Sequence, residues 1–323
     1  MPAKLDREGH RDRLRREHVV AAKKRIAVTA TKVDAALKVI HKKYGNDSIT
    51  TFLTHDQEPM QCFSTGHPTI DDVLTGDVDD KMNTVKGSGK GLPTGRIIEI
   101  YGPESAGKST LMLEFIKGVQ ESGGRAAYID VEHAFDPRYA QKGIGIDMAT
   151  LLFSQPTSAE QALGIAVDLA KSKAVDLIVI DSVAALVPER EDEKDVGAHS
   201  PGLHAKLMSQ ALRKITGYAS RNKVTVIFVN QIRNKIGVFF GSPETTTGGL
   251  SLKFYASIRL DIRRVKTLKK GTKAYGIRSR VRAVKNKVSV PFREWHMDIE
   301  RGQGITHVYG DLEFAGGGGG DDD

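Results

Sequence analysis

GPESAGKST, at residues 102–110, is the stretch of sequence that decides the fold. It fits the pattern G-x-x-x-x-G-K-[ST], whose glycines let backbone N–H groups turn inward around a phosphate. A strand-like apolar segment precedes it at 96–101 and a helical pattern follows at 109–120, so the positive end of a helix dipole faces the loop. This context predicts a nucleotide-binding loop, in which Lys108 reaches the β- and γ-phosphates and the Ser109 hydroxyl ligates Mg²⁺. The residues assigned to the loop are Gly102, Pro103, Glu104, Ser105, Ala106, Gly107, Lys108, Ser109 and Thr110.

Strand and helix patterns alternate around this loop. The predicted strands are 96–101, 126–131, 175–181, 224–230, 256–265 and 279–287, and the predicted helices are 109–120, 158–172 and 203–220. Several of the strands are near-continuous apolar runs, typical of strands buried on both faces of a parallel sheet. Alternation with short connections predicts an α/β fold, a mostly parallel twisted sheet flanked by helices.

The sequence divides into four parts. Residues 1–28 form a basic arm that we expect to be mobile, and 29–60 hold one short amphipathic helix and a linker, suited to docking on a neighbouring subunit. Residues 61–310 form the core, and the end AGGGGGDDD within 311–323 is predicted to be disordered. The helix has its apolar residues at Val33, Ala36, Leu37 and Ile40, and Gly45 stands where its C-terminus needs a positive φ.

A second glycine-rich segment lies upstream, within the polar stretch 77–95. Its GSGKG sequence invites interpretation as another phosphate loop. We reject this interpretation, because no glycine stands five residues before Gly89 and no Ser or Thr follows Lys90. The stretch is therefore an unusually long loop for a compact domain.

Composition excludes several classes of protein. Of the 323 residues, 39% are hydrophobic and 27% are charged, as in ordinary globular proteins. No run of 18 apolar residues occurs, which argues against a transmembrane helix, and no apolar segment follows the basic N-terminus as a secretory signal requires. Cys62 is the single cysteine, which excludes an intramolecular disulfide and a cysteine-cluster zinc site. We expect a reducing, cytoplasmic location and no membrane partner.

Positive charge is concentrated in two segments. Residues 1–25 hold nine Lys or Arg against four Asp or Glu, and residues 259–301 hold fourteen against four, although the net charge of the chain is only +8. Segregated positive charge is typical of proteins that bind polyanions. Basic faces also keep proteins soluble, so charge alone leaves nucleic-acid binding open.

Two carboxylates at predicted strand ends suit the chemistry of a phosphate loop. Asp181 ends the apolar strand LIVID, where a carboxylate holds Mg²⁺ directly or through water; alternatively it caps the following turn. Glu132 follows the strand AAYIDV and suits a general base that activates water at the γ-phosphate. The residues alone leave open whether Glu132 is catalytic or a solvated loop glutamate.

Six longer strings resemble the bacterial RecA recombinase family, over residues 31–310. They are GPESAGKST (102–110), YIDVEHAFDPRYA (128–140), VDLIVIDSVAAL (175–186), VNQIRNKIGVFFGSPETTTGG (229–249), LKFYASIRLDIRR (252–264) and VKNK (284–287). The resemblance implies a RecA-like P-loop ATPase that needs ATP and Mg²⁺. It also implies helical filaments of many copies on single-stranded DNA, which pair with homologous duplex DNA and exchange strands.

The resemblance also implies roles for residues at the nucleotide. Lys108 and Ser109 would hold phosphates and Mg²⁺, Asp181 would be the second metal-binding residue, and Glu132 would be the catalytic glutamate. Asp136 and Tyr139 match the positions that contact adenine, and Gln231 matches the residue that senses the γ-phosphate and couples it to DNA. Lys285 and Lys287, two apart on a strand, match lysines that reach the neighbouring subunit's ATP and act in trans, as arginine fingers do.

The same comparison implies a DNA-binding surface on two loops. The longer loop spans 232–249, and residues 190–202 resemble the family's other DNA-facing loop. On the helix that follows, Lys206 and Arg213 share a face. In the longer loop Arg233 and Lys235 suit phosphates, Ile236 suits wedging between bases, and backbone N–H groups suit a phosphate. The residues assigned to DNA are Lys206, Arg213, Arg233, Lys235, Ile236, Gly237, Thr247, Gly248 and Gly249.

This chain departs from the family pattern at several points. Ser109 stands where Thr is common, Pro201 where an apolar residue is usual, and Arg301 where an aromatic residue often contacts the nucleotide. The 77–90 segment has no counterpart in the pattern. The chain ends soon after Gly310, so we expect a reduced member without the family's C-terminal domain, which would fit a bacteriophage or another mobile element. In such a member we expect the basic arm 1–25 to contribute to duplex binding.

Two other functions share part of these features. A hexameric helicase of related fold has the P-loop and the catalytic glutamate but lacks the TTTGG and VKNK strings. A regulatory paralogue that binds DNA without turnover typically loses the glutamate or the P-loop lysine, and this chain keeps both Glu132 and Lys108. Filaments, as opposed to closed rings, would distinguish the recombinase from the helicase.

Overall fold

The computed structural model describes residues 32–49, 59–79, 85–189, 202–234 and 244–310. The chain divides into two compact units, Met1–Pro59 and Met60–Asp323. The first contains a helix at 32–44, which ends at Gly45 with φ 95° as the sequence predicts, and the 3₁₀ turn η1, Asn46–Ser48. Within the described residues, no helix has both the length and the apolar composition needed to cross a bilayer.

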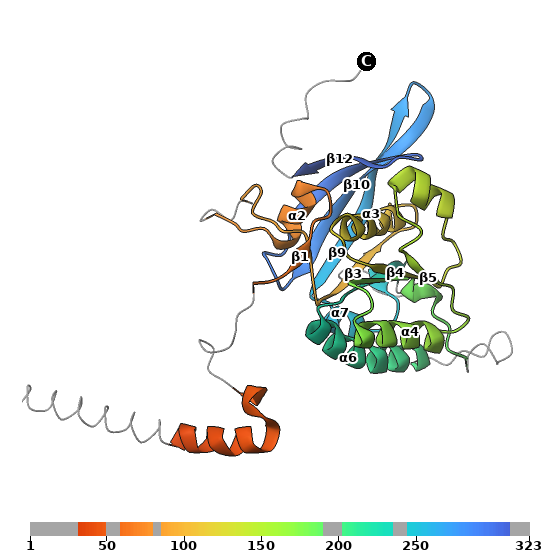
Figure 1. The fold of residues 1–323 in the computed structure, drawn as a ribbon. Helices are drawn as coiled ribbons and strands as arrows, with labels where there is room; N and C mark the ends of the chain where they lie inside the picture. The colour runs from red at the N-terminus through yellow and green to blue at the C-terminus, as the bar shows by residue number, and fades with distance from the viewer. Residues whose placement is uncertain (1–31, 50–58, 80–84, 190–201, 235–243, 311–323) are drawn as a thin grey trace, which may run out of the picture. The chain divides into compact units, whose positions relative to one another are not determined.

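The second unit is built on a ten-stranded sheet with the strand order β12-β11-β10-β9-β3-β7-β6-β4-β5, and β8 pairs with β7 (Figure 1). Its strands are β3 (Ile97–Gly102), β4 (Ala126–Asp130), β5 (Leu152–Ser154), β6 (Leu177–Asp181), β7 (Thr225–Asn234), β8 (Glu244–Thr246), β9 (Ile258–Lys270), β10 (Lys273–Asn286), β11 (Glu294–Glu300) and β12 (Gly304–Gly310). A separate two-stranded sheet pairs β1 (Cys62–Phe63) with β2 (Leu92–Pro93).

The helical elements lie around these strands. They are α2 (Pro68–Thr75), α3 (Lys108–Glu121), the π-helix η2 (Tyr139–Ile144), α4 (Ala159–Ser172), the 3₁₀ turn η3 (Val183–Ala185), α6 (Leu203–Asn222) and α7 (Ser251–Tyr255). Ser158 caps α4 by accepting a hydrogen bond from the N–H of Gln161, as its position in the sequence predicts.

The sheet confirms the predicted α/β class. Its central strands, from β9 through β3, β7, β6 and β4 to β5, pair in parallel. The sequence did not predict the antiparallel extension β9–β10–β11–β12, which widens the sheet on the other side of β9.

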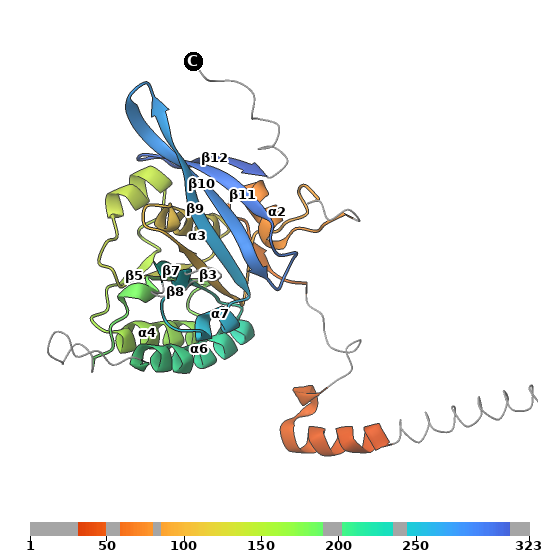
Figure 2. The same ribbon diagram turned by 180° about the vertical axis from the view of Figure 1, so that it is seen from behind.

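Both faces of the sheet are covered, because successive strand residues point to opposite sides. Ile98, Ile100 and Val179 belong to a buried core with α3, whereas Ile97 and Ile180 belong to a second core with α4 and α6. Figures 1 and 2 show α3 on one side of the strands and α4 with α6 on the other. This arrangement leaves the carboxyl ends of β3, β4, β6 and β7 together at one edge.

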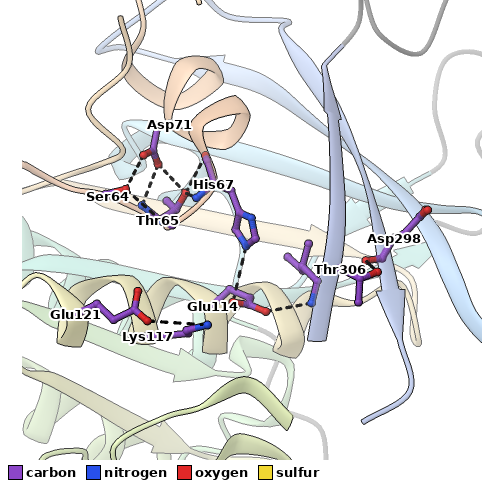
Figure 3. A network of polar contacts seen from close by, with 11 residues as sticks. Ser64, Thr65, His67, Asp71, Glu114, Lys117, Glu121, Asp298 and Thr306 are labelled. Carbon is purple, nitrogen blue, oxygen red and sulfur yellow. Dashed lines mark hydrogen bonds and ion pairs between the residues drawn. The ribbon is translucent and has the colours of Figure 1, made fainter. Parts of the chain in front are cut away.

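A polar network joins α2 to α3 and β12 (Figure 3). Asp71 accepts hydrogen bonds from the Ser64 hydroxyl and from both the N–H and hydroxyl of Thr65. Glu114 on α3 is buried, accepts the N–H of Ile305 at 3.0 Å and lies 3.8 Å from His67 Nε2. These contacts fix the outer antiparallel strand to the helix that begins at the phosphate loop.

The second glycine-rich segment is bound to α2. Asp72 accepts the N–H groups of Gly87 and Gly89 at 2.9 and 2.8 Å, and the Thr75 hydroxyl accepts those of Lys90 and Gly91. A Cβ at Gly89 would lie 2.2 Å from the Asp71 carbonyl oxygen, so only glycine fits. The amides that a phosphate loop would offer to a nucleotide are therefore bonded to protein oxygens, in agreement with the rejection of GSGKG as such a loop.

Candidate nucleotide-binding site

The GPESAGKST segment connects the end of β3 to the start of α3, as expected. Gly107 at the N-terminus of α3 has φ 94°, a left-handed conformation that favours glycine. A Cβ at Gly102 would lie 2.2 Å from the carbonyl oxygen of Ile262 on β9, so the neighbouring strand also demands glycine there. Ser279 on β10 also holds the loop, because its buried hydroxyl donates to the Ala106 carbonyl at 2.9 Å.

Lys108 folds back over the loop. Its Nζ donates to the carbonyl oxygens of Pro103 and Gly102 at 2.7 and 3.1 Å. Burial lowers the pKa of Lys108, and the nearby carboxylates of Asp181, Glu132 and Glu104 oppose that shift. The ammonium therefore sits in a setting where an arriving anion would stabilise it.

Ser109 and Asp181 meet at the edge of the sheet. The Ser109 hydroxyl donates to Asp181 Oδ2 at 3.2 Å, and the Tyr128 hydroxyl donates to the same oxygen at 2.7 Å. Asp181 ends β6 and is largely buried; this burial raises its pKa, against the hydrogen bond from Tyr128. A hydroxyl and a carboxylate oxygen at this distance are the hard oxygen ligands that Mg²⁺ prefers, so the residues fit this ion.

Glu132 lies just beyond β4, beside Asp181. The backbone N–H of Glu132 donates to the Asp181 carbonyl at 3.2 Å. Its Oε1 accepts hydrogen bonds from the Ser182 hydroxyl and from Gln231 Nε2, the latter at 2.9 Å. Gln231 is paired in register with Gly102, so the structure gathers three separately predicted segments around one carboxylate.

Asp136 and Tyr139 lie at the start of η2, which follows the Glu132 loop. Asp136 Oδ1 accepts the N–H groups of Arg138 and Tyr139 at 2.9 and 3.0 Å, and thereby orders the turn. The Tyr139 hydroxyl lies 3.1 Å from that of Thr110, which ties η2 to the first turn of α3. Burial raises the pKa of Tyr139. A groove of about 660 Å³ begins here, and its lining includes Asp136, Tyr139, Gly276 and Arg301.

Lys285 and Lys287 lie away from Lys108 of the same chain. On β10, Lys285 pairs in register with Arg259, which is paired in turn with Glu99, three positions before Gly102 on β3. Lys285 Nζ donates to the carbonyls of Lys253 and Phe254 at the end of α7, at 2.7 and 3.2 Å. Burial and the neighbouring cations Lys287 and Arg259 lower the pKa of Lys285.

The structure describes only some of the residues predicted to contact DNA. Lys206 and Arg213 are exposed on α6, and Arg233 is exposed on β7. Gly248 and Gly249 have positive φ and approach Val183 and Ala205, so the 247–249 turn lies against the first turn of α6, beside Lys206. Lys235, Ile236 and Gly237 lie outside the described residues, as do Pro201 and most of the 190–202 loop.

Sequence reasoning missed a polar group behind this site, formed by the buried Glu99 and Asn230 and the partly buried Arg259. Glu99 accepts hydrogen bonds from Asn230 Nδ2 at 3.0 Å and from Arg259 Nε at 2.5 Å. The one available signal was a glutamate inside the otherwise apolar strand IIEIY.

Comparison with known proteins agrees with this geometry. The family model described as the RecA N-terminal domain matches residues 31–306. Protein RecA of Streptomyces venezuelae is 52% identical over 283 residues, covering 88% of this chain and 71% of the relative. Protein RecA of Kineococcus radiotolerans is also 52% identical over 283 residues, covering 88% and 77%.

Among solved structures, the crystal structure of the RadB recombinase has the same fold. It superposes with a TM-score of 0.52 at 20% identity, covering 75% of this chain and 98% of that one. The fold, the phosphate loop with its strand-end carboxylates and the extent of the sequence match lead to one conclusion: the chain belongs to the RecA family of ATP-dependent recombinases.

Proposed function

We propose that this protein polymerises with ATP into helical filaments on single-stranded DNA and catalyses homologous pairing and strand exchange, with DNA-stimulated ATP hydrolysis. The observation that carries the proposal is the convergence of Lys108, Ser109, Asp181, Glu132 and Gln231 at one sheet edge. The family match supports the DNA-dependent part of the activity.

In this proposal Glu132 is the general base for hydrolysis. Its Oε1 already accepts two hydrogen bonds, so the carboxylate is held at one position beside Asp181. A carboxylate held in place accepts the proton of an attacking water without first having to be oriented. Lys108 and the loop N–H groups bind the phosphates, and Gln231 donates to the γ-phosphate.

Ser109 and Asp181 are the residues that would hold Mg²⁺, an ion that supplies neutralisation of phosphate charge when it is bound with ATP. The groove beyond Tyr139 takes the nucleoside. Asp136 lines it with an ordered carboxylate, and Tyr139 offers a half-buried ring for stacking.

Lys285 and Lys287 act on the ATP of a neighbouring copy. Lys285 lies on β10 and is engaged at the end of α7, which leaves it remote from Lys108 in the strand register of its own chain. Lys287, predicted on the same strand, lies one residue beyond the end of β10 at Asn286. The helix at 32–44, which exposes Val33 and Val39, docks on a neighbouring subunit in the same filament.

Single-stranded DNA lies along the 247–249 turn and the start of α6. Lys206 and Arg213 on α6 and Arg233 on β7 are exposed and suit phosphates. Lys235, Ile236 and Gly237, which lie outside the described residues, are assigned to the same DNA by the family resemblance. The filament then pairs with homologous duplex DNA, and the protein works in the cytoplasm without a membrane partner.

The test combines hydrolysis with imaging. We expect ATP turnover by the purified chain to rise with single-stranded DNA, and negative-stain images with an ATP analogue to show helical filaments. A strand-exchange assay between a circular single strand and a homologous linear duplex should give joint molecules only when the sequences match. Closed rings with duplex unwinding would support a helicase and would overturn the proposal.

A further inference from the structure

Glu99 is a carboxylate buried at the centre of the sheet. It lies on β3, is 0% exposed and stands directly opposite Arg259 of β9 in the strand register. Its Oε2 accepts Arg259 Nε at 2.5 Å and its Oε1 accepts Asn230 Nδ2 at 3.0 Å. A buried carboxylate is tolerated only when it is paired and hydrogen-bonded, and both of its oxygens are satisfied here.

Glu99 determines which way the Asn230 amide points. An ionised carboxylate only accepts hydrogen bonds, so Asn230 must turn its NH₂ group toward Glu99. Asn230 Oδ1 then faces the other way, where it accepts the Thr247 hydroxyl at 2.5 Å and the backbone N–H of Gln231 at 2.9 Å. Asn230 Nδ2 also donates to the Thr247 carbonyl at 3.1 Å. The amide is thus held by both of its ends.

The two residues that Asn230 holds belong to different parts of the proposed machinery. Gln231 donates to Glu132, the proposed base. Thr247 begins the turn whose glycines lie against α6 and which we assign to DNA. A single buried amide therefore contacts both the nucleotide side and the DNA side of the molecule.

We propose that Glu99 and Asn230 are positioning residues that couple occupancy of the 247–249 turn by DNA to the placement of Gln231 at Glu132. This inference rests on the proposed DNA-stimulated hydrolysis. When DNA shifts Thr247, the amide of Asn230 must follow, because it bonds both the carbonyl and the hydroxyl of that residue. Glu99, fixed by Arg259, prevents the amide from turning over and breaking the link to the Gln231 backbone.

The alternative is that Glu99, Asn230 and Arg259 only stabilise the sheet. The two roles differ in what a donor–acceptor exchange does. In Asn230→Asp a second carboxylate faces Glu99, so the pair repels. In the double variant Glu99→Gln with Asn230→Asp, the new amide NH₂ of residue 99 donates to the new carboxylate of residue 230, and its oxygen still accepts Arg259 Nε.

The experiment measures the ratio of DNA-stimulated to DNA-free ATP turnover at saturating ATP and saturating single-stranded DNA. Asn230→Asp should lower this ratio about tenfold, within the range typical of coupling between sites. The double variant should recover part of it, because the bonds to the Thr247 hydroxyl and the Gln231 N–H return while the bond to the Thr247 carbonyl stays lost. The ATP concentration for half-maximal rate should change little, because Lys108, Ser109 and Asp181 are untouched. Thr225→Val serves as the matched control: it removes another fully buried hydrogen bond of β7, to the Pro93 carbonyl, and should leave the ratio unchanged.

Each outcome decides the inference. An unchanged ratio in Asn230→Asp overturns it, as does a double variant that regains thermal stability but not the ratio. If Asn230→Asp does not fold, Thr247→Val replaces it, because it removes the hydroxyl bond to Asn230. Thr247 is also assigned to DNA, so single-strand affinity is measured in parallel, and an unchanged ratio at saturating DNA overturns the inference as well. A wild-type protein without any DNA stimulation would instead refute the proposed function.

Discussion

Gln231 Nε2 donates to Glu132 Oε1 across 2.9 Å, and this bond joins β7, three residues before its last residue Asn234, to the loop after β4. The two residues are 99 positions apart in sequence. Their contact places the proposed base and the proposed γ-phosphate sensor within hydrogen-bond distance of each other. An arriving γ-phosphate competes with Glu132 for the Gln231 amide, which would free the carboxylate to accept a proton from water.

Glu132→Gln should bind ATP and lose most hydrolysis, because an amide does not accept a proton from water. Loss of a positioned base typically costs about 10²–10⁴-fold. Steady-state turnover with single-stranded DNA, together with binding of a fluorescent ATP analogue, measures both properties. Glu121→Gln, an exposed position of α3, is the control and should behave as wild type. Near-normal turnover of Glu132→Gln would refute the assignment.

The double variant Lys285→Ala, Lys287→Ala should bind ATP and lose DNA-stimulated hydrolysis, because the missing charges belong to a neighbour's site. When it is mixed with Glu132→Gln subunits, activity should return, since the intact lysines of one protein then face the intact glutamate of the other. Lys269→Ala, Lys270→Ala, at exposed positions near the end of β9, is the control. Mixtures without recovered activity would show that the lysines do not act in trans.

Asp181→Asn should raise the melting temperature of the nucleotide-free protein at pH 8 and abolish the further stabilisation by Mg²⁺ and ATP. Burial raises the pKa of Asp181, so its contribution to stability is complete at low pH and is lost as pH rises through that raised pKa. The gain should therefore vanish toward acid pH, where wild-type Asp181 is protonated. Thermal melts from pH 4 to 8, with the exposed Asp147→Asn as control, measure this. A lower melting temperature at pH 8 would contradict it.

Gly102→Ala and Gly164→Ala should change stability in opposite directions. A Cβ at Gly102 would lie 2.2 Å from the Ile262 carbonyl oxygen, whereas one at Gly164 on α4 meets no atom within 4 Å. Alanine in an open helix position gains roughly 0.5–1 kcal/mol over glycine. Urea unfolding measures both changes, and we expect Gly102→Ala also to lose ATP binding. Equal changes in the unfolding free energy of the two variants would show that β9 moves to accommodate the added methyl group at residue 102.

Ser158→Ala should cost about 1 kcal/mol of unfolding free energy, because it removes the side-chain acceptor for the Gln161 N–H at the start of α4. Ser172→Ala, at the last residue of the same helix, removes a hydroxyl that donates to the Leu169 carbonyl and accepts the N–H of Ala174, both on the exposed surface where water replaces them. Its effect should remain within about 0.5 kcal/mol. Two similar losses would mean that the Ser158 cap contributes nothing specific.

Local sequence patterns correctly predicted the central strands and the phosphate loop. The apolar runs at 96–101, 126–131, 175–181 and 224–230 are strands because each is buried on both faces, and the phosphate loop follows from its own glycines. The hairpin of β9 and β10 extends beyond the predicted 265 and 279 to Lys270 and Lys273. Its outer part, KTLKKGTKAYG, has no apolar alternation, and pairing between the two strands keeps it extended.

The contacts behind the site could not be predicted from the sequence, because they depend on pairing between distant segments. Glu99 and Arg259 are 160 positions apart and meet because β3 and β9 pair in parallel, a register that no local pattern encodes. The same holds for Asp72, whose bonds to Gly87 and Gly89 depend on a loop that closes over α2. The motif in the sequence predicted which residues would contact ATP, but no local pattern pointed to the residues that hold them in place.

The attachment of the 77–91 segment to α2 offers a practical site for engineering. Val85 N–H donates to the Asp77 carbonyl at 3.1 Å, and Asp72 with Thr75 binds the backbone from Gly87 to Gly91. The described flanks of residues 80–84 are thus joined to each other by hydrogen bonds of their own. A fluorophore or an affinity tag inserted between Asp77 and Val85 should therefore report on assembly without perturbing ATP turnover.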